Sequence, residues 1–231
     1  MRAIILACQT LHRELRLALE KTKVDYSVVY IESGLHNEPE ALRRRIQEQL
    51  DMFDNVDVVL LVFGFCGNGL AGIKSSKFKL VIPRIHDCIP MLLGSADKRK
   101  AISKEMGTYF LTQGWLDYEK NILWEYERCL ERYGETRTKK VMKTMLGHYK
   151  RLLVIDTGAY SVEQITPRTM EFAEQVGLQH EVGKGSLRLI EKLLTGEWDD
   201  EMLVLEPGQE ITMTSMCIDV SEVGLSQVDR S

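Results

Sequence analysis

The sequence predicts an α/β fold, with mostly parallel sheets and flanking helices arranged as two Rossmann-like lobes with a cleft between them. Short apolar runs alternate with longer amphipathic segments along the chain, which is the pattern of repeated βαβ units. The apolar runs are rich in β-branched residues and bounded by turn residues, as expected for strands buried in a parallel sheet. The links between them are short, so we expect right-handed crossovers.

The elements can be justified in chain order. The first apolar run, at residues 2–7, predicts a strand, and the spacing of Leu11, Leu15 and Ala18 predicts a helix with one buried face. Pro39 fits the first turn of a second helix. Strands are predicted at residues 2–7, 26–31, 58–63, 79–82, 107–112, 152–155, 178–182 and 202–205. Helices are predicted at residues 11–20, 37–53, 89–93, 117–132, 135–149 and 162–176, with a last one that ends near residue 194.

Changes in composition divide the chain into four parts. Residues 1–115 are predicted to form an amino-terminal lobe that carries the cysteine and histidine loops, and residues 151–220 a carboxyl-terminal lobe. Two charged helices separated by Gly134 connect them across residues 116–150, where we expect the hinge. Residues 221–231 are polar and are predicted to be a loose tail.

The overall composition excludes several classes of protein. The 231 residues are 44% hydrophobic and 28% charged, which is typical of a globular protein. The net charge of −4 gives no support for a nucleic-acid partner. No apolar run approaches the roughly 18 residues of a membrane span, and no signal peptide begins the sequence. We therefore expect a cytoplasmic protein with no membrane partner.

Three of the five cysteines follow predicted strands. Cys8 follows the first strand, Cys66 the third, and Cys88 lies just beyond the fourth, while His36 follows the second. Parallel strands would bring these side chains to one edge of the sheet. Three thiolates with an open position suit Zn²⁺ or an iron–sulfur cluster with one free iron. The alternative is that each cysteine is a small buried apolar residue, which is the role we assign to Cys129 and Cys217.

Other polar side chains in these loops are candidates for catalysis or substrate binding. His86 and Asp87 are predicted to act as a general acid and base, or to ligate the metal. The alternative for Asp87 is that it caps the helix that follows. Glycines around residue 184 could hold an anion at a helix start, although a glycine C-cap with a serine N-cap explains them equally well. The predicted substrate-binding residues are Arg84, Asn68, Thr157 and Lys184.

Several sequence blocks resemble the DUF1638 family, a domain of unknown function frequent in methanogens and other anaerobes. Besides the thiol after the first strand, these blocks are LHNEPEAL (35–42), FGFCGNGLAGI (63–73), LVIPRIHDCIPMLLGS (80–95) and GTYFLTQGW (107–115). The resemblance covers about residues 1–200. In the Cys8 block the family pattern has glycine after the cysteine, whereas this chain has Gln9.

The resemblance supplies a context but no activity. Such proteins are often found alongside corrinoid-dependent methyl-transfer systems, which implies a small-molecule substrate and a corrinoid protein or methyltransferase as partner. We therefore expect a metal centre held by Cys8, Cys66, Cys88 and His36, with methyl-group or thiol transfer as the leading reaction. The alternatives are an iron–sulfur lyase or reductase, and a non-catalytic binding or chaperone partner of a methyltransferase system. A metal-free enzyme with Cys66 or Cys88 as nucleophile and His86 as base is a further alternative.

Overall fold

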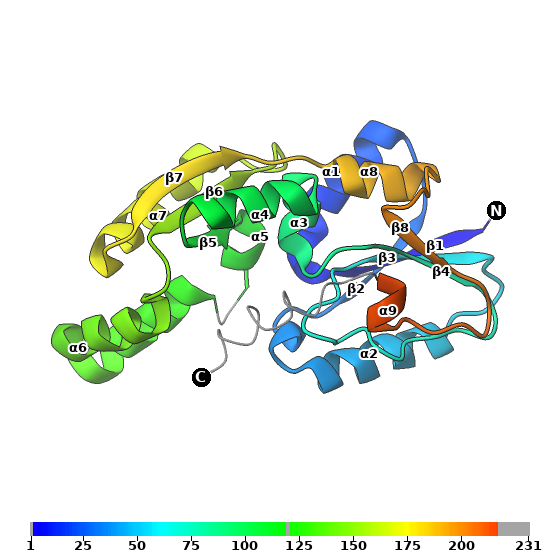
Figure 1. The fold of residues 1–231 in the computed structure, drawn as a ribbon, viewed down its shortest axis with the longest axis horizontal. Coiled ribbons are helices and arrows are strands. Elements are labelled where there is room, and N and C mark those ends of the chain that lie inside the picture. Colours follow the sequence, from blue (N-terminus) through cyan, green and yellow to red (C-terminus); the bar gives the residue numbers. More distant parts are fainter. Residues whose placement is uncertain (1, 119–120, 217–231) are drawn as a thin grey trace.

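Two β-sheets form the frame of the protein (Figure 1). The computed structural model describes residues 2–118 and 121–216, without the side chain of His36. The larger sheet has the order β2-β1-β3-β4-β8 and contains β1 (Ala3–Cys8), β2 (Ser27–Ile31), β3 (Val58–Val62), β4 (Lys79–Pro83) and β8 (Met202–Leu205). The smaller sheet contains β5 (Thr108–Leu111), β6 (Arg151–Asp156) and β7 (Gln179–Lys184) in that order. Every pairing is parallel except that of β8 with β4, so the α/β prediction is confirmed.

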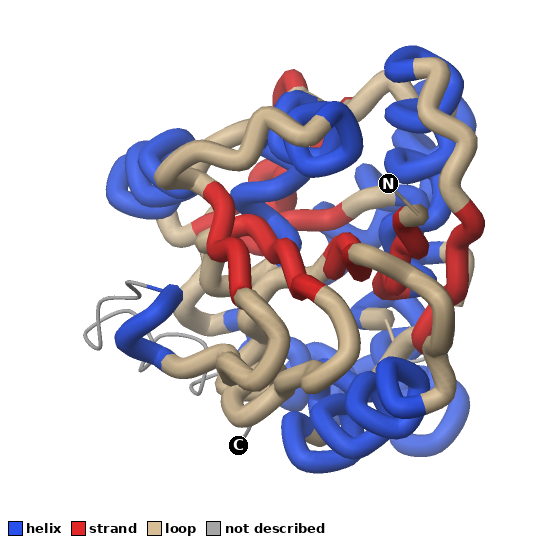
Figure 2. Tube along the Cα trace, turned by 90° about the vertical axis from the view of Figure 1, so that its right-hand side faces the viewer, coloured by secondary structure: helices blue, strands red, loops and turns tan. Residues whose placement is uncertain are grey.

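Helices cover both faces of the five-stranded sheet (Figures 1 and 2). One face carries α1 (His12–Thr22), α3 (Cys88–Leu93) and α8 (Arg188–Thr195), and the other carries α2 (Pro39–Asp51) and α9 (Met213–Met216). Successive side chains of β1 alternate between these layers. Ile5 packs in the cluster of α1 and α8, whereas Leu6 packs with Ile46 of α2. This burial on both faces explains why the strands lack polar alternation.

The three-stranded sheet packs against α6 (Ile122–Leu146) and α7 (Val162–Val176). At Gly134 the backbone of α6 has φ 70° and ψ 170°, which separates two helices as the sequence predicted. Buried Arg151 of β6 joins all three strands, because it donates to Thr108 Oγ1 of β5 (3.1 Å) and Glu181 Oε2 of β7 (2.8 Å). None of the helices in the described part of the chain has both the length and the apolarity of a membrane span.

The lobes divide the chain differently from the prediction. β5, expected in the lobe of residues 1–115, pairs with β6 in the three-stranded sheet. β8, expected in the lobe of residues 151–220, pairs antiparallel with β4 of the five-stranded sheet, and α8 packs on the same sheet. Apolar patterns predict that a strand exists but not which sheet it joins. The predicted tail and Cys217 lie outside the described residues.

Within the described residues the chain crosses between the sheets twice, at neighbouring points. The first crossing leaves α3 and passes through α4 (Ala96–Glu105), and the second runs from β7 into α8 (Figure 1). Ser186 N donates to Leu92 O (2.8 Å), and Arg188 Nη2 donates to Gly94 O (2.6 Å). The helices around Gly134, where we expected the hinge, instead pack within the second lobe because their apolar faces meet α7. The connections between the lobes are therefore the paired segments near residues 94 and 185.

Candidate functional site

Three cysteines lie where parallel strands of the five-stranded sheet end. Cys8 is the last residue of β1, Cys66 lies in the loop after β3, and Cys88 begins α3 after β4. Burial raises the pKa of the Cys66 thiol, and the nearby Cys8 thiol raises it further. Burial also raises the pKa of Cys88, with further contributions from Cys66 and Cys8. We call these three cysteines at the strand ends the thiol cluster.

Backbone contacts fix the Cys66 loop against the loop after β4. Phe65 N donates to Ile85 O (3.0 Å), and Cys66 N donates to His86 O (2.8 Å). Gly64 permits this contact, because a Cβ at that position would lie 2.3 Å from the carbonyl carbon of Asp87. Backbone hydrogen bonds thus join the Cys66 loop to the segment that leads into Cys88.

The Cys66 backbone is in a left-handed conformation that is uncommon outside glycine. The φ angles of Cys66, Gly67 and Asn68 are 47°, 58° and 72°, and Gly69 N closes the turn on Cys66 O (3.1 Å). For a residue with a side chain this conformation costs about 1–2 kcal/mol. Such backbone strain clusters at functional sites, so it supports a functional role for this loop.

The second lobe contributes Tyr118 near Cys8. The Tyr118 hydroxyl lies 3.3 Å from His12 Nδ1, which is 3.1 Å from Gln9 O. Burial raises the pKa of Tyr118, and Asp117 and Cys8 raise it further. Cys8 itself has its pKa raised by burial, against the opposing effect of a Thr10 hydroxyl 3.1 Å from its sulfur. No motif marks Tyr118, so sequence reasoning missed it.

The side chain of His36, the fourth predicted metal ligand, is outside the described part of the chain. Within the described residues, no three His, Cys, Asp or Glu side chains are placed to hold a metal ion. The backbone of His36 lies in a short 3₁₀ turn, η2 (Leu35–Asn37). Cys129 lies in the core between α6 and α7, as expected for a packing residue.

The two predicted acid–base residues differ in their contacts. Asp87 Oδ1 accepts from Ile89 N (2.9 Å), so the capping alternative is confirmed, and Oδ2 pairs with Arg99 Nη2 (3.0 Å). The negative charge of Asp87 also contributes to the raised pKa of both Cys66 and Cys88. His86 is half-buried, and its backbone carbonyl accepts the hydrogen bond from the Cys66 amide. A catalytic role for either side chain stays a prediction.

The predicted substrate-binding residues are not gathered in one place. Arg84 donates to the backbone carbonyls of Ser215 and Met202, so it joins α9 and β8 to the sheet. Lys184 is exposed at the end of β7, and the Gly185 amide next to it donates to Asp156 O (2.6 Å). The remaining two are Thr157, which faces the first lobe, and Asn68, which lies two residues beyond Cys66.

A comparison with protein families assigns the chain. The family model described as "Protein of unknown function (DUF1638)" matches residues 30–194, which is more than half of the sequence. The chain belongs to the DUF1638 family. The match includes Cys66 and Cys88 but begins within β2, so Cys8 lies outside it. No curated protein and no solved structure matches this DUF1638 protein.

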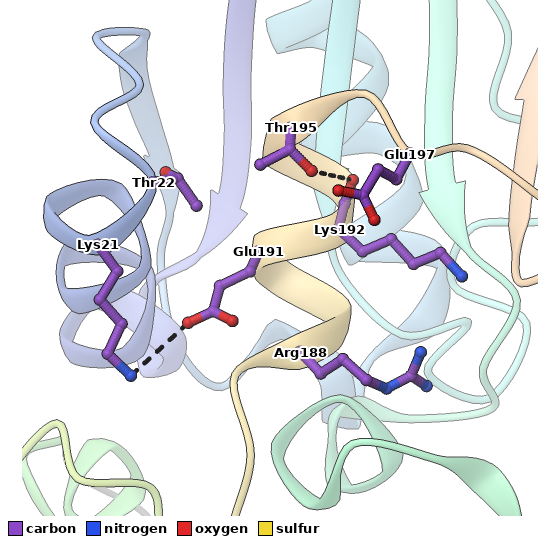
Figure 3. Close-up of a pocket in the computed structure, with 7 residues that line it drawn as sticks. All are labelled: Lys21, Thr22, Arg188, Glu191, Lys192, Thr195 and Glu197. Carbon is purple, nitrogen blue, oxygen red and sulfur yellow. Dashed lines mark hydrogen bonds and ion pairs between the residues drawn. The ribbon is translucent and has the colours of Figure 1, made fainter.

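A surface depression of about 440 Å³ lies between α1 and α8 (Figure 3). Lys21 is in the last turn of α1, whereas Cys8 lies before its first turn, so the depression and the thiol cluster are at opposite ends of this helix. Most of the charges along it are paired: Lys21 Nζ is 3.6 Å from Glu191 Oε1, and Arg188 Nη2 is 2.6 Å from Glu201 Oε1. The paired charges indicate a structural role in this DUF1638 protein.

A buried carboxyl group joins the two lobes. Glu14 is 0% exposed, and its Oε1 accepts from Thr157 Oγ1 (3.0 Å). Its Oε2 is buried without a hydrogen-bond partner among the described residues. Burial raises the pKa of Glu14 above its ordinary value of 4.5. Its place on the apolar face of α1, between Leu11 and Leu15, is the only sequence signal of this burial.

Glu14 should make stability depend on pH. A carboxyl group whose pKa is higher in the folded state contributes to the unfolding free energy. The contribution is fully present at pH values below the pKa in the unfolded state, and it is lost as the pH rises through the pKa in the folded state. We expect the unfolding free energy of the wild type to fall relative to Glu14→Gln by about 1 kcal/mol or more between pH 4.5 and 8. Urea unfolding across this range measures the difference. Exposed Glu20 on the same helix is the control, and Glu20→Gln should follow the wild type; equal pH slopes for wild type and Glu14→Gln would contradict the prediction.

Proposed function

We propose that Cys8, Cys66 and Cys88 hold a metal centre that acts on a small molecule. The observation that carries this proposal is the thiol cluster itself. Three half-buried cysteines lie together at one edge of the sheet, at or just beyond the carboxyl ends of three neighbouring parallel strands. Structural cysteines that served only as packing residues would not need to share one edge, or to adopt the strained backbone of Cys66.

These thiols need a nearby positive charge to ionise near neutral pH. Burial and mutual repulsion raise the pKa of Cys66 and Cys88, so the thiolates are disfavoured unless a positive charge compensates them. A divalent metal supplies that charge and deprotonates its thiol ligands. The donor set of three sulfurs suits Zn²⁺ or an iron–sulfur cluster. A metal held by three protein ligands would keep one position for the substrate, which it would activate as a thiolate.

The leading reaction is methyl-group or thiol transfer linked to anaerobic one-carbon metabolism. This part of the proposal rests on the association of the family with corrinoid-dependent systems, and a corrinoid protein or methyltransferase is the proposed partner. Unpaired thiols suit a reducing compartment such as the cytoplasm, where disulfides are rare. His86 and Asp87 lie in the loop that contacts Cys66 and are the proposed acid–base residues.

Metal analysis of protein purified without air tests the proposal. We expect about one zinc, or one iron–sulfur cluster, per chain in the wild type, and less than about a tenth of this in Cys8→Ala, Cys66→Ala and Cys88→Ala. Cys129→Ala is the matched control, because Cys129 is buried in the second lobe, and it should keep the metal. Visible absorbance from sulfide-to-iron charge transfer would distinguish a cluster from zinc.

Other outcomes would favour the alternatives. A wild type with less than about a tenth of an equivalent of either metal would contradict the metal centre. Activity in metal-free protein that is lost in Cys66→Ala or Cys88→Ala would instead indicate a cysteine nucleophile. Co-purification with a methyltransferase, and no turnover by the isolated chain, would indicate a non-catalytic binding partner.

A further inference from the structure

Arg43 extends from α2 to the loop that carries Cys66. Its side chain is half-buried, and Nη2 donates to the backbone carbonyl of Asn68 (2.9 Å). Its Nε is buried and has no hydrogen-bond partner among the residues that the structure describes. No carboxylate of these residues pairs with it. The guanidinium therefore has a positive charge and a free N–H donor at the loop that carries Cys66.

Three other half-buried or buried arginines of the described chain have acidic partners. Arg13 Nε lies 2.6 Å from Asp117 Oδ2, Arg99 Nη2 lies 3.0 Å from Asp87 Oδ2, and Arg151 Nη1 lies 2.8 Å from Glu181 Oε2. A charge that is partly removed from water without a partner is unfavourable. Arg43 thus has the charge and the free donors that an anionic ligand would satisfy.

Asn68 adds a second unsatisfied group at the same place. Its Oδ1 is buried and lacks a hydrogen-bond partner within the described chain. A rotation of the amide by half a turn replaces this acceptor with the Nδ2 donor. The hydrogen bond from Gly69 N to Cys66 O closes a turn around Asn68, and the ends of such a turn are less than about 7 Å apart. A group bound by Arg43 and Asn68 would therefore lie at the turn that carries Cys66.

We infer that Arg43 and Asn68 bind an anionic oxygen group, a carboxylate or a phosphate, of the substrate. The planar guanidinium can present two parallel N–H groups to such an anion, which adds strength and orientation. This inference deepens the proposed function. Together they describe the substrate as a small thiol whose anionic group binds at Arg43 and whose sulfur faces the thiol cluster. The thiol part of this description rests on the proposed function. Anion binding itself does not require the metal.

Thermal unfolding of the full chain with added inorganic phosphate or acetate, at constant ionic strength set with sodium chloride, tests this inference. We expect a saturable rise in Tm of about 2–4 °C for the wild type with at least one of the two anions. Arg43→Gln should lose this rise. Arg44→Gln is the matched control, because Arg44 is the exposed neighbour on the same helix, and it should retain the rise. The anion with the larger effect identifies phosphate or carboxylate as the bound group.

Arg43→Lys covers the case in which Arg43→Gln does not fold. It keeps the charge but not the guanidinium fork, so the phosphate or acetate concentration that gives half the effect should increase at least about tenfold. An equal rise in wild type and Arg43→Gln, an unchanged half-effect concentration in Arg43→Lys, or no saturable rise in the wild type would overturn the inference. The metal content of Arg43→Gln should equal that of the wild type. Metal analysis therefore tests the metal centre alone, and the thermal shift with phosphate or acetate tests the anion site alone.

Discussion

Replacing Gly64 by alanine is expected to lower the unfolding free energy by about 3 kcal/mol and to remove the metal-binding capacity proposed for the thiol cluster. A Cβ on residue 64 would lie 2.3 Å from the carbonyl carbon of Asp87 and 2.4 Å from its Cα. Both are backbone atoms, so no side chain can rotate away. The loops must separate, and the hydrogen bonds Phe65 N to Ile85 O and Cys66 N to His86 O would lengthen or break.

Gly72→Ala provides the comparison for this experiment. Gly72 follows in the same segment and has φ +83°, but no atom lies within 4 Å of the position of its Cβ. Its replacement should cost only the conformational strain of about 1 kcal/mol. Urea unfolding and metal analysis of both variants measure the difference. Similar stability losses, or metal retained in Gly64→Ala, would show that the close approach of the two loops does not hold the thiol cluster together.

Local sequence patterns predicted the elements well because those elements depend on local physics. The expected strand at residues 202–205 and helix at residues 162–176 have the observed bounds. The partner of that strand could not be predicted in the same way. β8 pairs with β4 more than a hundred residues away, and this pairing depends on the core that α8 completes. Assignment of β5 and β8 to the wrong lobes has the same origin, because an apolar run does not encode its neighbour.

The thiol cluster was predictable from topology, whereas the groups around it were not. Parallel strands place Cys8 and Cys66 at one edge whatever the details of packing. Arg84 also follows a strand, but its orientation is set by carbonyls of β8 and α9, whose positions the sequence did not give. Arg43 has no motif, and it becomes informative only because it lacks an acidic partner in the described chain and contacts Asn68.

Gly114→Ala is expected to separate the lobes and to lower the unfolding free energy by about 3 kcal/mol. Gly114 lies in α5 (Gln113–Leu116), and a Cβ there would be 1.9 Å from the carbonyl oxygen of Thr10 in the other lobe. The Cβ would meet the backbone of Thr10, which cannot rotate away as a side chain could, so α5 must move away from the loop that follows Cys8. Such a shift would also weaken the hydrogen bond between Thr157 and Glu14 across the same interface.

The separation can be measured by small-angle scattering together with urea unfolding. Gly158→Ala is the matched control: Gly158 also lies in the second lobe and has φ +75°, but no atom lies within 4 Å of the position of its Cβ. It should lose about 1 kcal/mol and keep the radius of gyration of the wild type. If the contact between lobes also brings Tyr118 to Cys8, Gly114→Ala should impair turnover more than metal content, since it leaves the loops of Cys66 and Cys88 joined. A radius of gyration and a stability equal to those of Gly158→Ala would contradict this prediction. They would show that the contact between Gly114 and Thr10 does not form in solution, and that Tyr118 has no part in the site.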